Sequence, residues 1–139
     1  MKKKCAFFIG VVLVFAMACG KSSGRYAEYR TYMEKSIQAQ EEYLSAIDRA
    51  ESAGDVALAI NKFAERIQAL EPLRKSHLEK YPEMSMEKEP PAELRDIANR
   101  QNELAEKIER ASEKNLAPYL LDPVVVEAVK NLSRAMGEN

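Results

Sequence analysis

The stretch VALAINKFAERIQAL, residues 56–70, decides the fold class of this chain. Its large apolar residues recur alternately four and three positions apart, at Val56, Ile60, Phe63, Ile67 and Leu70. That spacing places them along one side of an α-helix and is typical of helices that pack lengthwise along a shared seam. We therefore predict an amphipathic helix here, with Leu73, His77, Leu78 and Tyr81 continuing its apolar side.

Two further segments carry the same helical pattern. Residues 25–53 contain no proline or glycine, and three- and four-residue steps join Tyr26, Tyr29, Met33, Ile37, Gln40, Leu44 and Ile47. Gly54 and Asp55 then predict a helix stop followed by the N-cap of the next helix, a link so short that the two helices must be antiparallel. From Pro91 to Pro118 a third apolar face comprises Leu94, Ile97, Ala98, Gln101, Leu104, Ala105, Ile108 and Ala111.

Proline and glycine mark the remaining boundaries. Pro72 removes a backbone donor and clashes with the carbonyl of Gln68, which predicts a kink or a break in the second helix. Residues 81–91 read as a polar loop. Asp122 and Pro123 predict the start of a short last helix that ends at Gly137. The valines at 124–126 would also suit a strand, but no other segment offers a partner strand.

These segments predict an all-α fold in one domain, residues 25–139. Each of the three long segments has about 25 residues and, at 1.5 Å per residue, a length close to 38 Å. Three apolar faces of equal length can cover one another. We expect an elongated antiparallel three-helix bundle with a short fourth C-terminal helix closing one end.

The N-terminus reads as a secretory signal peptide, residues 1–18. Lys2, Lys3 and Lys4 precede an apolar run from Cys5 to Ala18, which is short for a permanent membrane span. The following Ala16-Met17-Ala18-Cys19 resembles the lipobox of bacterial lipoproteins. This resemblance implies that a diacylglyceryl group with fatty acyl chains such as palmitate is attached to the Cys19 thiol and that cleavage occurs just before it. The alternative is ordinary cleavage after Ala18, which leaves a soluble secreted protein.

The resemblance also implies a location in the bacterial cell envelope. Gly20 follows the cysteine, as in many lipoproteins sorted to the outer membrane, and residues 19–24 then form the lipidated cysteine and a flexible linker. Without Lys2, Lys3 and Lys4 the 21 basic residues become 18 against 22 acidic residues, a net charge of −4. No basic patch stands out, so we expect no nucleic-acid partner.

Catalytic signatures are missing from the sequence. There is no glycine-rich phosphate loop and no G-x-S-x-G elbow, and His77 is the single histidine. Because His77 continues an apolar seam, we interpret it as a packing side chain, and we predict neither enzymatic activity nor a cofactor. His77, Met84 and Met86 form a weak candidate metal site, since imidazole and thioether ligands suit Cu(I). Otherwise the methionines fold back onto the bundle.

Tyr26, Tyr29 and Tyr32 lie close in sequence to the proposed anchor. They could contact lipid headgroups or a protein partner, or they could edge the core of the bundle. The sequence thus favours a lipid-anchored helical envelope protein that acts as a structural or docking module. Its expected partners are the membrane and an envelope protein, with a homodimer also open. The alternative is a periplasmic or surface lipoprotein that binds a small ligand or a metal around His77, Met84 and Met86.

Overall fold

The computed structural model of this protein describes residues 24–85 and 89–137. Four α-helices make up most of this part: α1 (Ala27–Asp48), α2 (Ala53–Lys80), α3 (Arg95–Asn115) and α4 (Pro123–Ala135). Short 3₁₀ turns stand between them: η1 (Pro82–Ser85), η2 (Ala92–Leu94) and η3 (Ala117–Tyr119). No strand occurs in the described ranges, and the three valines lie in α4. The predicted all-α fold, with three long helices and a short fourth one, is confirmed.

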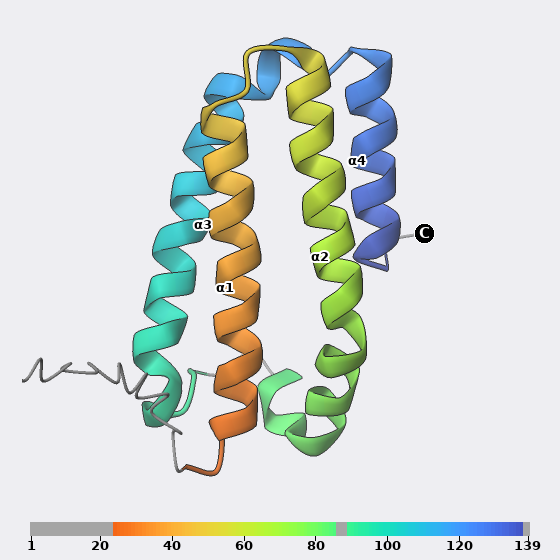
Figure 1. The fold of residues 1–139 in the computed structure, drawn as a ribbon. Helices are drawn as coiled ribbons and strands as arrows, with labels where there is room; N and C mark the ends of the chain where they lie inside the picture. The colour runs from red at the N-terminus through yellow and green to blue at the C-terminus, as the bar shows by residue number, and fades with distance from the viewer. Residues whose placement is uncertain (1–23, 86–88, 138–139) are drawn as a thin grey trace, which may run out of the picture.

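Consecutive helices run antiparallel, so that α1 and α3 point one way and α2 and α4 the other (Figure 1). Helix α1 packs against both α2 and α3, and α4 packs against α2. The short helix α4 lies alongside the first half of α2, not across the end of the bundle (Figure 1). We call the end where α1 begins and α2 finishes the proximal end. The opposite end, with the α1–α2 connection and η3, is the distal end.

The α1–α2 connection differs in detail from the sequence-based prediction. The N-cap of α2 is Ser52 and not Asp55, and Gly54 lies inside the first turn instead of ending α1. The Ser52 hydroxyl accepts a hydrogen bond from the Asp55 backbone N–H at 3.2 Å, and the Asp55 carboxylate accepts from the Ser52 hydroxyl at 2.7 Å. This reciprocal pair resembles a capping box, in which a serine begins the helix and an acidic side chain three positions later supports it.

Helix α2 continues through Pro72, so the predicted break does not occur. Pro72 and Gln68 are both exposed. The carbonyl that loses its donor is therefore on a side of the helix where water can bind it. The helix bends gently in this half (Figure 1), as expected when a proline removes one bond of the ladder. Both ends of α4 were predicted correctly. Asp122 caps its start, and Gly137, with φ of 79°, follows its last turn.

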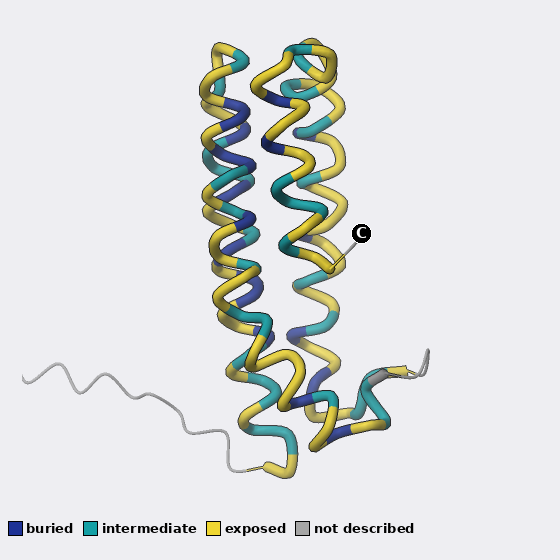
Figure 2. Tube along the Cα trace, turned by 90° about the vertical axis from the view of Figure 1, so that its right-hand side faces the viewer, coloured by how far each residue is buried: buried dark blue, intermediate teal, exposed yellow. Residues whose placement is uncertain are grey.

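The core has a distal and a proximal part. The distal part joins α1, α2, α3 and α4, and Ile47, Val56, Ile60 and Val125 in it are at most 1% exposed. Tyr43 stacks on Phe63 there, with ring centroids 4.9 Å apart. The proximal part joins α1 to α3 and comprises Met33, Ile37, Leu94, Ile97 and Leu104. Buried segments face inward along every helix, whereas the connection between α3 and α4 is mostly exposed (Figure 2).

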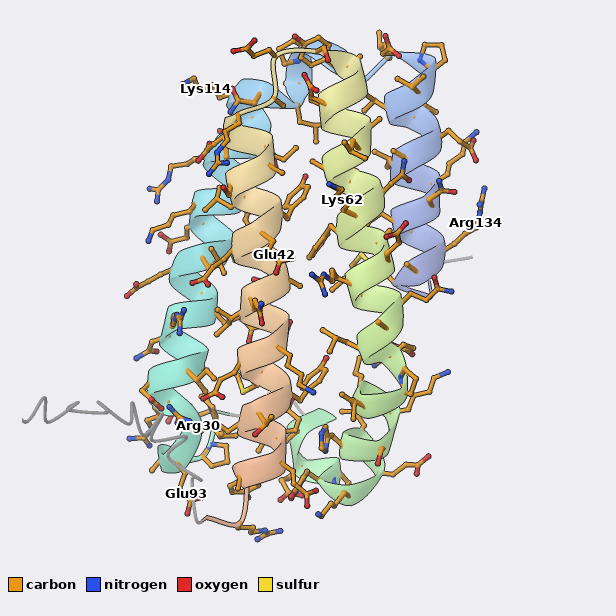
Figure 3. All side chains as sticks on the ribbon, viewed as in Figure 1. Arg30, Glu42, Lys62, Glu93, Lys114 and Arg134 are labelled. Atoms are coloured by element: carbon orange, nitrogen blue, oxygen red, sulfur yellow. The ribbon has the colours of Figure 1, made fainter. Side chains whose placement is uncertain are left out.

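Charged side chains reinforce the contact between α1 and α3. Arg30 on α1 donates from both terminal guanidinium nitrogens to the Asp96 carboxylate, and it also donates to the backbone carbonyl of Glu93 at 3.1 Å (Figure 3). The hydrogen bond from Arg30 is the main cause that lowers the pKa of Asp96 from 3.8 to about 2. Arg100 and Glu41 make a second ion pair across the same two helices.

We predict that Ile60→Ala lowers the free energy of unfolding by about 2–5 kcal/mol, because it leaves a cavity in a fully buried site. Leu58→Ala serves as the matched control. It removes a side chain that is 54% exposed two positions away, and should cost about 1 kcal/mol or less. Urea unfolding of the chain from residue 20 onward measures both. Equal losses in the two variants would contradict the assigned core.

Asp96→Asn tests the pairing of α1 with α3. The folded-state pKa of Asp96 lies below its usual value, so the ionised carboxylate stabilises the fold fully above about pH 4 and loses this effect as the pH falls toward 2. The stability gap between the parent protein and Asp96→Asn should therefore narrow from pH 5 to pH 2 in urea titrations. Arg30→Gln should abolish the same pH dependence. A gap that stays constant down to pH 2 would count against the pairing.

Candidate functional site

The predicted site residues of the described chain gather at the proximal end. Tyr29 and Tyr32 of α1 pack against His77 of α2, and Tyr26, just before α1, packs against Tyr81, just beyond α2. We call these five residues the proximal aromatic cluster. The ring centroids of Tyr29, Tyr32 and Tyr81 lie 6.0, 5.7 and 6.2 Å from that of His77. Such separations are typical of packed aromatic pairs. The cluster joins the first turns of α1 to the last turn of α2.

His77 is the buried polar group of this cluster. Its side chain is only 7% exposed, and its Nδ1 atom is buried with no hydrogen-bond partner among the described residues. A buried polar atom without a partner costs about 1–3 kcal/mol. The ring itself fills space between three tyrosines, which agrees with the interpretation of His77 as a packing side chain. The unpaired nitrogen is the one feature of the cluster that packing does not explain.

The hydroxyl groups of Tyr26 and Tyr81 link the start of α1 to the segment that follows α2. The Tyr26 hydroxyl donates to the Glu83 carboxylate at 3.0 Å, and the Tyr81 hydroxyl donates to the backbone carbonyl of Arg25 at 3.0 Å. Tyr29 and Tyr32 are half-buried, and burial raises the pKa of both phenols above the usual value. Tyr26, Tyr29 and Tyr32 thus edge the proximal core, and each remains partly exposed.

Of the weak metal candidates, His77 and Met84 lie within the described residues. Met84 is half-buried against the proximal core, as expected of a methionine that folds back onto the bundle. Met86, like Cys19, lies outside the described residues. Within residues 24–85 and 89–137 there is no group of three or more His, Cys, Asp or Glu side chains that could hold a metal.

A small cavity lies beside the aromatic cluster. It measures about 150 Å³, with Tyr29, Met33 and Met84 in its wall and the Glu83 and Glu89 side chains also lining it. His77 does not line it. Pockets for drug-sized ligands usually measure about 300–1,000 Å³, so this one would accept only a very small molecule. The unpaired Nδ1 atom therefore does not point to an obvious ligand cavity.

The distal end carries a feature that the sequence reasoning missed. Four large apolar side chains are about half exposed or more there: Leu58 at 54%, Leu120 at 49%, Leu121 at 94% and Val124 at 51%. We call these four residues the distal tip. They come from the second turn of α2, the turn after η3 and the first turn of α4, all at one end of the bundle (Figure 1). The adjacent leucines at 120–121, set between Pro118 and Pro123, were the available sequence signal.

Hydrogen bonds fix the backbone that presents the distal tip. The Tyr119 hydroxyl donates to the backbone carbonyl of Glu51 at 3.1 Å and ties η3 to the α1–α2 connection. The Asp122 N–H donates to the Tyr119 carbonyl at 2.9 Å, and the Asp122 carboxylate caps α4 by accepting from the Val124 N–H at 3.0 Å. The two leucines are thus exposed on an ordered turn.

Two grooves run along the sides of the bundle. One of about 760 Å³ follows α2 past the end of α4, with polar walls that include Gln68, Glu71 and Arg134. Glu71 and Arg134 are already ion-paired, with Arg74 and with Glu127. The other, of about 310 Å³, lies between α1 and α3, with Leu44 and Ala111 in its wall and Asp48, Lys107, Arg110 and Lys114 at its sides. Lys114 lies near the distal end of α3 (Figure 3).

Comparison of the chain with protein families, with characterised proteins and with solved structures found no match. The function must therefore be argued from the chain itself. Within the described part of the chain, no helix is both long and apolar enough to cross a membrane.

We predict that His77→Phe keeps or raises the free energy of unfolding. Phenylalanine retains an aromatic ring between the three tyrosines and removes the unpaired nitrogen, so the expected change lies between zero and a gain of about 2 kcal/mol. His77→Ala removes the ring as well and should destabilise by about 2 kcal/mol or more. Urea unfolding compares the two variants. A large loss in His77→Phe would show that the imidazole makes a polar contact essential to the fold.

Proposed function

We propose that this protein is a lipid-anchored helical protein of the bacterial envelope that acts as a docking module. In this proposal the lipobox-like Ala16-Met17-Ala18-Cys19 supplies the anchor through acyl chains on Cys19. In this proposal the protein has no catalytic role, and the outer membrane is its expected location because Gly20 follows the cysteine.

The observation that carries the proposal is the contrast between the two ends of the bundle. The described chain starts at Gly24, close in sequence to Cys19, and enters α1 at the proximal end (Figure 1). The exposed apolar side chains of the distal tip lie at the opposite end. Helix α1 has 22 residues and spans about 33 Å. A protein tethered at one end and adhesive at the other is suited to hold a partner at a distance from a membrane surface.

The alternative is a lipoprotein that binds a small ligand or metal near His77, Met84 and Met86. The unpaired Nδ1 atom of His77 favours it, since a ligand could supply the missing hydrogen bond. The small volume of the adjacent cavity, and the fact that His77 does not line it, argue against it. We therefore rank the docking role first.

Acylation at Cys19 is the first test of the proposal. Intact-mass analysis of protein purified from its native membrane should find a chain that begins at Cys19 and carries a diacylglyceryl group, because multiple acyl chains give stable anchoring. Cys19→Ser should remove the modification and release the protein from the membrane fraction. Cys5→Ser, which changes the other cysteine, should leave both unchanged. A bare Cys19 sulfur, or a retained leader, would refute the anchor.

A further inference from the structure

We infer that the distal tip docks on a protein partner that presents an apolar pocket edged by basic side chains. This inference rests on the proposed docking function and names the surface and the chemistry of the partner. The tip consists of Leu58, Leu120, Leu121 and Val124, as defined above.

The distal tip exposes an unfavourable amount of apolar surface to water. A single exposed leucine is ordinary in soluble proteins, but several large apolar side chains exposed at one end are typical of interaction sites. Leu121 is the extreme case, since 94% of it is exposed although its neighbour Tyr119 packs against the distal core. Burying these side chains in a partner would remove apolar surface from water, at about 25 cal/mol per Å².

The turn that carries Leu120 and Leu121 is ordered. Pro118 and Pro123 restrict the backbone on either side, and the hydrogen bonds of Tyr119 and Asp122 fix the turn between them. A surface that is already ordered loses little conformational entropy on binding. Two leucines held outward on such a turn are therefore suited to act as anchors that insert into a pocket.

Acidic residues outnumber basic ones at the distal end. Residues 48–58, residues 117–124 and the end of α3, residues 110–115, together carry five acidic residues against three basic ones: Asp48, Glu51, Asp55, Glu113 and Asp122 against Arg49, Arg110 and Lys114. The helix dipoles do not offset this excess, because α1 and α3 end here while α2 and α4 begin here. These acidic residues of the distal end, which we call the acidic rim, are complementary to a partner whose apolar pocket has basic edges.

The same observations argue against the other occupants. In the proposed arrangement the membrane lies at the proximal end, because the four residues 20–23 between Cys19 and the described chain can span at most about 14 Å, less than half the length of α1. Anionic lipid headgroups would be repelled by the acidic rim. A second copy meeting tip to tip would bring two acidic rims together. A different protein with basic groups is the occupant that fits.

Site-specific photo-crosslinking in cells tests the inference with the full, acylated chain. A photo-crosslinking residue replaces Leu121 in one version and Glu106, on the exposed outer side of α3, in the control version. We expect one discrete protein adduct from position 121 and none of the same mass from position 106. Mass spectrometry of the adduct should locate the link in a partner segment where apolar residues stand beside lysine or arginine.

Two added substitutions test the chemistry of the contact. Leu120→Ser should lower the yield of the adduct about tenfold, because it removes an apolar anchor. Glu51→Lys should lower it severalfold by reversing a charge at the rim, since the Glu51 side chain is exposed and makes no ion pair among the described residues. Glu103→Lys, on α3, is the charge-reversal control and should leave the yield unchanged. Urea unfolding of each variant confirms that the fold is kept.

Several results would overturn the inference: no adduct from position 121, a crosslink to a second copy or to lipid, equal adducts from positions 121 and 106, or a partner segment without basic residues. The outcome is separable from the test of the proposed function. An acylated Cys19 with partner crosslinks only from position 106 would keep the anchored docking protein and reject the tip. A bare Cys19 with the expected adduct from position 121 would keep the tip and reject the anchor.

Discussion

Helix α1 must bury two sides at once, and the arrangement of the other helices follows from this constraint. One side packs against α2 and the other against α3. Ile37 and Ile47 are almost completely buried as a result, and so are smaller or more polar residues such as Ser36 and Ala39. With α1 between them, α2 and α3 each have a further side that α1 does not cover. Helix α4 covers part of that side on α2.

The short length of α4 divides α2 into two differently stabilised halves. Helix α4 has 13 residues and α2 has 28, so α4 extends along about 20 Å of a helix about 42 Å long. The covered half contains the fully buried Val56 and Ile60. In the other half the proximal aromatic cluster and the ion pair of Lys80 with Glu28, 2.6 Å apart, secure the end of α2 to the start of α1. The buried His77 is part of the proximal aromatic cluster and so helps to hold this half of α2 against α1.

The helices could be predicted from the sequence because their apolar spacing is local. The same spacing misses the second buried side of α1: Tyr43 lies off the predicted seam, yet it is buried and stacks on Phe63 because α1 has two neighbours. Gly54 was wrong as a helix stop, since Ser52 with Asp55 makes a stronger cap than a glycine signal indicates. Pro72 does not break α2 because its side of the helix is exposed and tertiary packing continues on the other side.

The candidate site was less predictable than the fold, for a related reason. The spacing of Tyr26, Tyr29 and Tyr32 indicated that they lie near one another, but their contact with His77 depends on the antiparallel pairing of α1 and α2. The distal tip depends still more on tertiary structure. Leu58 lies off the predicted seam of α2, but only the antiparallel order of the helices brings it to the same end of the bundle as Leu120, Leu121 and Val124.

The two ends of the bundle are functionally complementary in the proposed role. Stable protein interfaces usually bury about 800 Å² on each partner, and four side chains at the end of a narrow bundle offer less than this. A contact of this size would be weak between proteins free in solution. If, as proposed, the chain is anchored through Cys19 in the same membrane as the partner, the effective concentration of the tip rises, and linked contacts of this kind gain affinity without any new interaction. A small, ordered apolar tip is therefore sufficient for docking when the opposite end of the bundle is tethered.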